Sequence, residues 1–414
     1  SNPPGGTMPA ATGTSSLVFA SPGANASSQM NISWHHTTSG GYLEYTKKSD
    51  TTYANKVQVA PSSTSASFVS TSDGNSQGYN GTVSYFRKLV NITGLTANTE
   101  YRYRIIGSSA SSDYYFKTAS TTTFSFIYMS DVHAYPALSS RLSTANSLVS
   151  RAESKVSGLS FVLFTGDLTA HGSDYYQWKH FATAPFAKNY FLASVPGNHD
   201  YYKAQGSVYP EHTSDVYYNA MFNNPKNGAS GISNSSYYFK YNNVLFVGIN
   251  SEVLDTTRRN AQKSWLSTVI NNNPSDFVIA FSHREFFHGS TASAPSGVAK
   301  SSDCYNIYGS TLESLGVDLV LSGDDHVYVR SKPIKNGAVS TASVGTVYIT
   351  ANQIGARGRI ATAASSYSAK VYGGSTNNND ISTISTITVS STQITGQMFN
   401  ASGTVLDTYS IPKK

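Results

Sequence analysis

Residues 161–170 read FVLFTGDLTA, an apolar run that ends in Gly166-Asp167. Such a run, without polar alternation, is typical of a strand buried on both faces. The arrangement recurs along the chain: FSFIYMS precedes Asp131-Val132-His133, FLASVP precedes Gly197-Asn198-His199-Asp200, FVIAFS precedes His283, and VDLVLS precedes Gly323-Asp324-Asp325-His326. Ligands in layered α/β proteins gather outside the carboxyl ends of strands. The five polar blocks therefore predict one shared site on loops.

The segments between these blocks alternate in character. Helical spacing of apolar residues appears over residues 137–156, 173–184 and 260–272, so helices separate most of the blocks. Asn242-Asn243 lies between two apolar runs and predicts a short hairpin. The C-terminal residues 383–411 read as two or three further strands. This region is therefore of the α/β (α+β) class.

The ordered blocks resemble those of the calcineurin-like metallophosphoesterase family, whose motifs are D-x-H, G-D, G-N-H-[DE], a lone His after a strand, and G-H-x-H. The resemblance covers roughly residues 120–350. It implies a four-layer α/β/β/α sandwich that holds two divalent metal ions. Such a pair lowers the pKa of a bridging water and stabilises charge on the phosphoryl group, which is what phosphoester hydrolysis requires.

Carried over by position, the resemblance implies a role for each polar residue. The first metal would be bound by Asp131, His133, Asp167 and His326, and the second by Asp167, Asn198, His283 and Asp324. Asp167 would bridge the ions, because a carboxylate has two oxygens. A hydroxide bridging the metals would be the nucleophile. His199 would be the general acid, with Asp200 orienting its imidazole and raising its pKa.

Three positions distinguish this chain from its relatives. The purple acid phosphatase branch has D-x-G in its first block and, three residues after the bridging Asp, a Tyr whose phenolate binds ferric iron; here those positions are His133 and Ala170. We therefore expect a colourless protein that uses Fe, Mn or Zn as divalent ions. Asp324 replaces the first His of G-H-x-H, and a harder carboxylate ligand favours Mn, Mg or Fe at the second site. The alternative is that Asp324 does not reach the metal, by natural drift or by engineering.

Residues 13–119 contain β-like alternation and turn residues without a long helical pattern. The run 95–101, LTANTEY, resembles the corner of fibronectin type III domains at which a Tyr hydroxyl bonds back to the backbone, and Tyr101 would be that residue. Trp34 would fill the core of the sandwich. The chain is therefore divided into a fibronectin type III-like domain at 13–119, as in purple acid phosphatases, and a metallophosphoesterase domain at 120–414.

Composition narrows the setting of the protein. Charged residues make up only 13% of the 414 residues, and there are 29 Tyr, which is more usual in exported proteins; residues 1–16 then read as a flexible leader. No apolar stretch approaches the roughly 20 residues needed to cross a bilayer. The net charge of +6 comes from scattered residues, so no specific nucleic-acid binding is expected. We predict a secreted protein.

The function predicted from these observations is phosphomonoester hydrolysis. A phosphodiesterase, including the cyclic nucleotide type, is the alternative, because Asp324 leaves the metal site neutral instead of singly positive, and a diester carries less charge. A catalytically weakened extracellular binding protein, with carbohydrate or cell-surface contact through the N-terminal domain, is the second alternative. Further candidates for substrate contact are His288, Arg357 and Arg359, and the Tyr-rich stretch 201–238 as a cleft wall.

Overall fold

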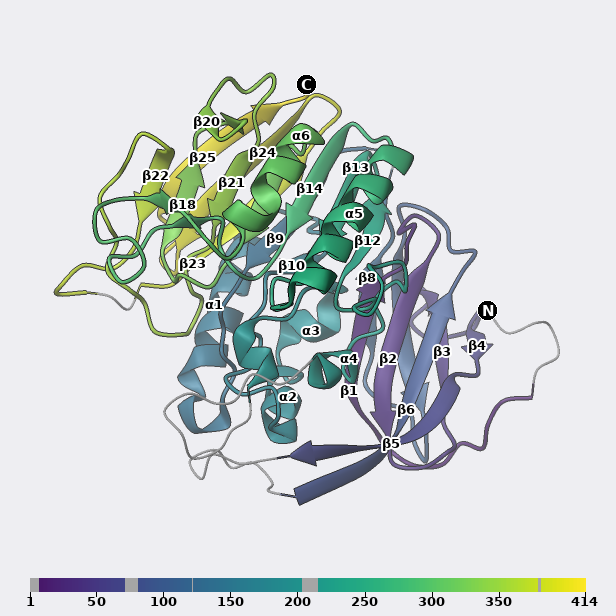
Figure 1. Ribbon diagram of the computed structural model, residues 1–414. Coiled ribbons are helices and arrows are strands. Elements are labelled where there is room, and N and C mark those ends of the chain that lie inside the picture. Colours follow the sequence, from purple (N-terminus) through teal and green to yellow (C-terminus); the bar gives the residue numbers. More distant parts are fainter. Residues whose placement is uncertain (1–6, 71–80, 121, 203–214, 379–380) are drawn as a thin grey trace.

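The computed structural model describes residues 7–70, 81–120, 122–202, 215–378 and 381–414. Figure 1 shows an all-β region beside a larger region of strands and helices. The strands of the all-β region are β1 (Ser15–Pro22), β2 (Met30–His36), β3 (Tyr42–Lys47), β4 (Val57–Val59), β5 (Ser62–Ser70), β6 (Gly81–Ile92), β7 (Glu100–Ile106) and β8 (Tyr114–Lys117).

The larger region follows in chain order. Its strands are β9 (Phe124–Met129), β10 (Val162–Phe164), β11 (Leu192–Ser194), β12 (Tyr237–Tyr241), β13 (Val244–Gly248), β14 (Phe277–Phe281), β15 (Phe287–His288), β16 (Ala299–Lys300), β17 (Leu319–Ser322), β18 (Tyr328–Ser331), β19 (Ile334–Lys335), β20 (Ala338–Val339), β21 (Val347–Thr350), β22 (Ser368–Tyr372), β23 (Thr383–Val389), β24 (Gln393–Asn400) and β25 (Val405–Pro412). Its helices are α1 (Ser140–Lys155), α2 (Tyr175–Phe181), α3 (Pro185–Asn189), α4 (Val216–Asn219), α5 (Thr256–Asn272) and α6 (Ser310–Ser314), with the short turns η1 (Pro136–Leu138), η2 (Asn198–Tyr201) and η3 (Tyr305–Gly309).

The N-terminal region is a β-sandwich of two four-stranded sheets, in the orders β1-β2-β6-β5 and β4-β3-β7-β8. Trp34 on β2 is fully buried between the sheets, as predicted. The Tyr101 hydroxyl accepts a hydrogen bond of 2.9 Å from the backbone N–H of Thr96, so the predicted tyrosine corner is also confirmed. Trp34 therefore fills the core of this domain, and the Tyr101 hydroxyl stabilises its corner.

Two larger sheets form the centre of the second region. One has the order β11-β10-β9-β23-β24-β25, and the other has the order β12-β13-β14-β17-β21-β18-β22. Within them, β9, β10 and β11 are parallel, and so are β13, β14, β17 and β21. The sheets pack face to face through aromatic side chains, such as Phe126 and Phe246 at 5.6 Å between ring centroids.

Helices cover the outer face of each sheet, which confirms the four-layer α/β/β/α sandwich (Figure 1). Successive side chains of a strand point to opposite faces, so β9 sends Phe126 to the inter-sheet core and Ile127 toward α1. Leu266 and Val269 of α5 pack on β13 in the same way. The three helices predicted from periodicity are α1, α2 and α5, and Asp255 caps α5 by accepting a hydrogen bond from the Arg258 N–H.

The two antiparallel additions to these sheets are also confirmed. Tyr241 pairs with Val244, so Asn242 and Asn243 form a two-residue hairpin turn between β12 and β13. Asn242 has φ of 52°, a left-handed conformation that asparagine tolerates better than most residues. At the C-terminus, β23 pairs antiparallel with β9, and β24 and β25 continue the first sheet, each antiparallel to the strand before it.

The N-terminal segment differs from the prediction of a flexible leader. Residues 1–6 lie outside the described residues. The Ala10 carbonyl accepts a hydrogen bond from the Gly41 N–H, and the Thr12 carbonyl lies 2.7 Å from His36 Nε2. The prediction is therefore wrong for residues 10–16, which pack on the sandwich or begin β1. Among the described residues, no helix is both long enough and apolar enough to cross a membrane.

Candidate metal centre

The five polar blocks meet at the carboxyl ends of the parallel strands, as the sequence predicts. Asp131 and His133 follow β9, Asp167 follows β10, Asn198 follows β11, His283 follows β14, and Asp324 and His326 follow β17. Two groups of side chains result. The first half-site is defined as Asp131, His133, Asp167 and His326, and the second as Asp167, Asn198, His283 and Asp324. Within each half-site, the candidate ligand atoms of the Asp and His residues lie within 4.8 Å of one another.

Most of these candidate ligands have a strained, left-handed backbone conformation. Asp131, His133, Asp167, Asp324 and His326 all have φ between 49° and 73°. Left-handed conformations are uncommon for residues other than glycine, and when they cluster they usually mark functional sites. The fold thus accepts local strain at five of the seven candidate ligands.

Glycines next to the candidate ligands provide the room for close approach. A Cβ on Gly197 would lie 2.2 Å from Asp167 Oδ1, and one on Gly323 would lie 2.5 Å from Asp131 Oδ2. Any side chain at either position would collide with the carboxylates. Glycine is therefore needed at these two positions because two loops touch there.

The first half-site is deeply buried. His133 Nε2 lies 2.9 Å from Asp167 Oδ2, and His326 Nε2 lies 3.1 Å from Asp131 Oδ1. None of its four residues is more than 8% exposed. Carboxylates buried to this degree need a partner charge or a cation. This half-site offers a cation two imidazoles and two carboxylates as ligands.

The second half-site shares Asp167 with the first. His283 Nε2 lies 3.3 Å from Asp167 Oδ2, 3.3 Å from Asp324 Oδ1 and 2.9 Å from Asn198 Oδ1. The side chain of Asp324 is 26% exposed, whereas that of His283 is fully buried. Asp324 thus reaches the group that the sequence assigned to it, on the side open to solvent.

The imidazoles are oriented for ligation by backbone carbonyls. His283 Nδ1 lies 2.7 Å from the Thr165 carbonyl, and His326 Nδ1 bonds to the Arg357 carbonyl. A carbonyl accepts only from a protonated nitrogen, so Nε2 of each ring keeps its lone pair for a cation. The donor set therefore fits two divalent ions of the kind that imidazole and carboxylate bind.

Mixed charges shift the pKa values of the cluster strongly. Burial alone would lower the pKa of His133, but Asp167 and Asp131 raise it to about 9. Burial would raise the pKa of Asp131, yet the neighbouring His326 imidazole holds it well below its usual range. His199 behaves differently, because burial and then His133 lower its pKa to about 3. Such opposed shifts in one place are typical of functional sites.

The structure contradicts the role predicted for Asp200. His199 Nδ1 bonds to the Ala170 carbonyl at 2.8 Å, and the ring packs 4.1 Å from that of His133. The carboxylate of Asp200 instead accepts hydrogen bonds from the backbone N–H groups of Leu168, Thr169 and Gly197. Asp200 therefore ties together the loops after β10 and β11. The pKa of Asp200 is raised to about 7 by burial and then Asp167.

The candidates for substrate contact lie around the rim and have partners of their own. Arg359 pairs with Asp325 at 3.1 Å, and His288 Nδ1 bonds to Glu285 at 2.6 Å. Arg357 is exposed and contributes its backbone carbonyl to His326. Of these three, Arg357 is the one whose charge faces solvent without a recorded ion pair among the described residues. Within the Tyr-rich stretch, residues 203–214 lie outside the described residues.

Sequence reasoning overlooked several supporting residues. Ser130 donates to Asp131 Oδ2 at 2.6 Å, and Tyr202 accepts from Asn198 Nδ2 at 2.6 Å. Asp325 accepts from the backbone N–H groups of Gly289 and Ser290 and so fixes the loop after β15. Its position between two candidate ligands was the available signal for Asp325. For Ser130 and Tyr202, the sequence carries no signal except that they lie close to the polar blocks.

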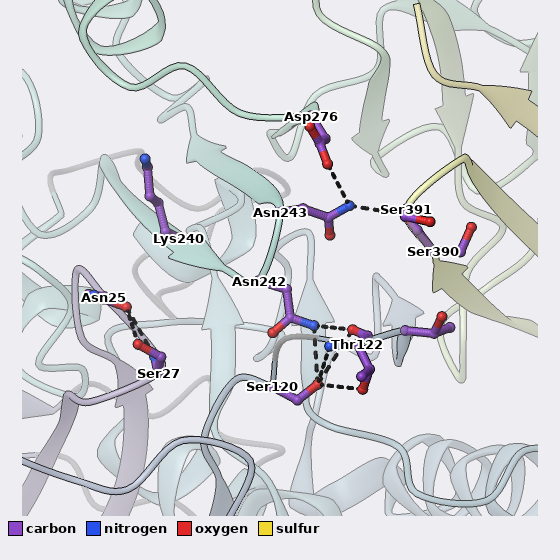
Figure 2. Close-up of a pocket in the computed structure, with 11 residues that line it drawn as sticks. Asn25, Ser27, Ser120, Thr122, Lys240, Asn242, Asn243, Asp276, Ser390 and Ser391 are labelled. Atoms are coloured by element: carbon purple, nitrogen blue, oxygen red, sulfur yellow. Dashed lines mark hydrogen bonds between the residues drawn. The ribbon is translucent and has the colours of Figure 1, made fainter.

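A second cleft, of about 710 Å³, lies away from these blocks, at the hairpin turn and the linker to the sandwich. Figure 2 shows Asn242 and Asn243 in the middle, with Ser120, Thr122, Asp276 and Ser390 around them. All its lining residues are polar, whereas small-molecule sites are mostly apolar with a few polar groups. The metal cluster is therefore the stronger candidate site.

Comparisons with known proteins agree with this geometry. The calcineurin-like phosphoesterase family model matches residues 124–328, and that of the purple acid phosphatase N-terminal domain matches residues 16–118. A purple acid phosphatase from yellow lupin (Lupinus luteus) seeds has a TM-score of 0.74 at 17% identity, over 97% of this chain and 74% of that one. The structure of PhoD has a TM-score of 0.62 at 14% identity, over 100% of this chain and 92% of that one. No curated protein matches the chain.

The fold and the two matched models make the chain a hydrolase of phosphoric esters whose residues 124–328 form a calcineurin-like phosphoesterase domain. More narrowly, it joins that catalytic domain to the N-terminal domain of the purple acid phosphatases. The absence of that branch's tyrosinate at Ala170 stays a prediction from the sequence; in the structure the Ala170 carbonyl lies 2.8 Å from His199 Nδ1.

Proposed function

We propose that the chain is a phosphomonoesterase that binds two divalent metal ions in the two half-sites and uses His199 as general acid. The observation that carries the proposal is the convergence of both half-sites on Asp167, which contacts His133 at 2.9 Å and His283 at 3.3 Å. Two cations bound there would supply charge neutralisation and water activation for attack on phosphorus. Asp167 would be the ligand common to both ions.

The protein's own groups perform the remaining steps. His199 Nδ1 donates to the Ala170 carbonyl, which leaves Nε2 as the atom that transfers a proton to the leaving-group oxygen. The negative charge of a bound phosphate would raise the pKa of this imidazole from the low value that burial and His133 give it. Arg357, exposed beside His326, supplies a guanidinium for a phosphoryl oxygen.

Phosphodiester hydrolysis, including that of cyclic nucleotides, is the second candidate, and Asp324 favours it. Its carboxylate adds negative charge on the solvent side of the second half-site, 3.3 Å from His283. A monoester near neutral pH carries up to two negative charges, whereas a diester carries one. The added charge therefore disfavours the monoester more, and it also favours Mn, Mg or Fe over Zn at the second half-site.

We further propose that the protein is exported, given its low content of charged residues and its N-terminal domain of the purple acid phosphatase type. We assign residues 13–119 to a fibronectin type III-like domain and residues 120–414 to the catalytic domain. The tyrosine corner at Tyr101 supports the fibronectin comparison. The exposed surface of this sandwich is where carbohydrate or cell-surface contact would occur.

The test is hydrolysis of an aryl phosphate monoester and of its bis-aryl diester by metal-stripped protein reloaded separately with manganese, ferrous iron, zinc or magnesium. We expect faster monoester turnover, lost in His199→Ala and kept in His180→Ala, a histidine of α2 outside both half-sites. Faster diester turnover would select the diesterase. Two bound ions without turnover of either ester would instead indicate the weakened binding protein.

A further inference from the structure

Two adjacent tyrosines each accept a hydrogen bond from an asparagine carboxamide. Asn250 Nδ2 donates to the Tyr201 hydroxyl at 2.8 Å, and Asn198 Nδ2 donates to the Tyr202 hydroxyl at 2.6 Å. The second carboxamide alone reaches a half-site, because Asn198 Oδ1 lies 2.9 Å from His283 Nε2. Two chemically similar pairs, one residue apart, therefore differ in whether their asparagine is a candidate ligand.

A carboxamide binds a cation through its oxygen, since its nitrogen carries two protons and no available lone pair. The two ends have nearly the same size, so packing alone does not decide which end faces a cation. A partner that accepts from the nitrogen end does decide it. Partners of this kind orient metal ligands in many proteins, and removing one typically costs about tenfold to a hundredfold in metal affinity.

Tyr202 is itself held on both sides. Its backbone N–H donates to the His199 carbonyl at 3.1 Å, and its carbonyl accepts from the Ser173 N–H at 3.0 Å. Its ring lies 4.7 Å from the ring of His199. The hydroxyl thus projects from a fixed backbone, and the ring packs against the proposed general acid.

We propose that Tyr202 is a positioning residue that holds Asn198 with its oxygen toward the second metal ion and supports the ring of His199. The inference rests on the proposed two-metal function. It assigns the second half-site a support that the first does not share, because Asn198 is the only carboxamide among the seven candidate ligands.

The experiment compares Tyr202→Phe with Tyr201→Phe in the full chain. Manganese is titrated into metal-free protein by calorimetry without substrate, and the two binding equivalents are fitted separately. In Tyr202→Phe we expect one equivalent, that of the second half-site, to lose about tenfold to a hundredfold in affinity and the other to change less than about twofold. Excess manganese should restore most of kcat, because phenylalanine keeps the ring beside His199. Tyr201→Phe should keep both affinities, whatever its effect on thermal stability.

Unchanged affinity for both equivalents in Tyr202→Phe would overturn the inference. Equal weakening of both equivalents, or the same pattern in Tyr201→Phe, would also overturn it, because the effect would then come from general loosening of η2. The titration contains no substrate, so a wild-type protein that binds two ions but hydrolyses no ester would refute the proposed activity and still test Tyr202. A wild-type protein that binds fewer than two ions would refute both.

Discussion

The two half-sites of the metal centre share Asp167 but differ in depth and in donors. The first has two imidazoles and two carboxylates, all nearly inaccessible to solvent. The second has one imidazole, one carboxamide and two carboxylates, and its Asp324 side chain is 26% exposed. The comparison teaches that the departure from the family motif lies on the accessible side. We expect a substitution at Asp324 to change the metal selectivity and the preference for substrate charge. Substitutions in the buried first half-site should be poorly tolerated.

Loss of the shared ligand should have the largest effect, because it breaks both half-sites together. Asp167→Asn removes the charge that bridges the two ions, and losing several kcal/mol of transition-state stabilisation lowers kcat/KM by more than about 10⁴-fold. Metal content by mass spectrometry should fall below one ion per chain. Asp318→Asn, at a buried carboxylate that accepts from the Val278 N–H, is the matched control and should keep two ions. Two retained ions in Asp167→Asn would refute the bridging role.

The next effect separates catalysis from metal binding. His199 follows a ligand of the second half-site in sequence, but its ring packs on His133 of the first. His199→Ala should lower kcat about a hundredfold to ten-thousandfold, as expected for loss of a general acid. Both ions should remain, as measured by titration. A parallel loss of metal would mean that the ring is a structural part of the first half-site.

Replacement of Asp324, the residue that differs from the motif, should change metal selectivity more than the rate of turnover. Asp324→His restores an imidazole to the second half-site and removes one negative charge, so zinc affinity relative to manganese should rise about tenfold or more. The ratio of monoester to diester turnover should rise with it. Asp303→His, at an exposed carboxylate that pairs with Arg284, is the control for added histidine. Unchanged selectivity would mean that Asp324 does not ligate.

The smallest expected effect concerns the loops that carry the two half-sites. Asp200→Asn replaces an acceptor of several N–H groups by a carboxamide whose nitrogen cannot accept. One or more buried donors lose a partner, which costs roughly 1–3 kcal/mol of stability. Urea denaturation should show this loss, with activity reduced severalfold at saturating metal. Asp276→Asn, at a carboxylate whose side chain is 39% exposed, should leave the denaturation midpoint unchanged.

Sequence patterns predicted the strands and the meeting of the polar blocks, because apolar runs mark buried strands and parallel strands end at one edge, whereas the four layers were implied by the family resemblance. The patterns did not predict hydrogen-bond partners that come from groups distant in the sequence. Asp200 was paired with its sequence neighbour His199, but its donors are the N–H groups of Leu168 and Thr169 on another loop. Arg359 was assigned to phosphate, and its contact with Asp325 depends on the fold of two loops. Tyr202 gave no signal, because hydrogen-bond geometry has no sequence period.

Each half-site draws ligands from both central sheets, since Asp167 follows β10 in one sheet, whereas His283 and Asp324 follow β14 and β17 in the other. In the part of the chain that the structure describes, the two sheets share no backbone hydrogen-bond ladder. Their relative position depends on interlocked rings such as Phe126 and Phe246. A slide of one sheet by a single residue, about 3.3 Å, would be as large as the distances that join His283 to Asp167 and to Asp324, 3.3 Å each. The aromatic layer between the sheets therefore sets the relative position of the candidate ligands. We expect metal binding to be lost when that layer is disturbed.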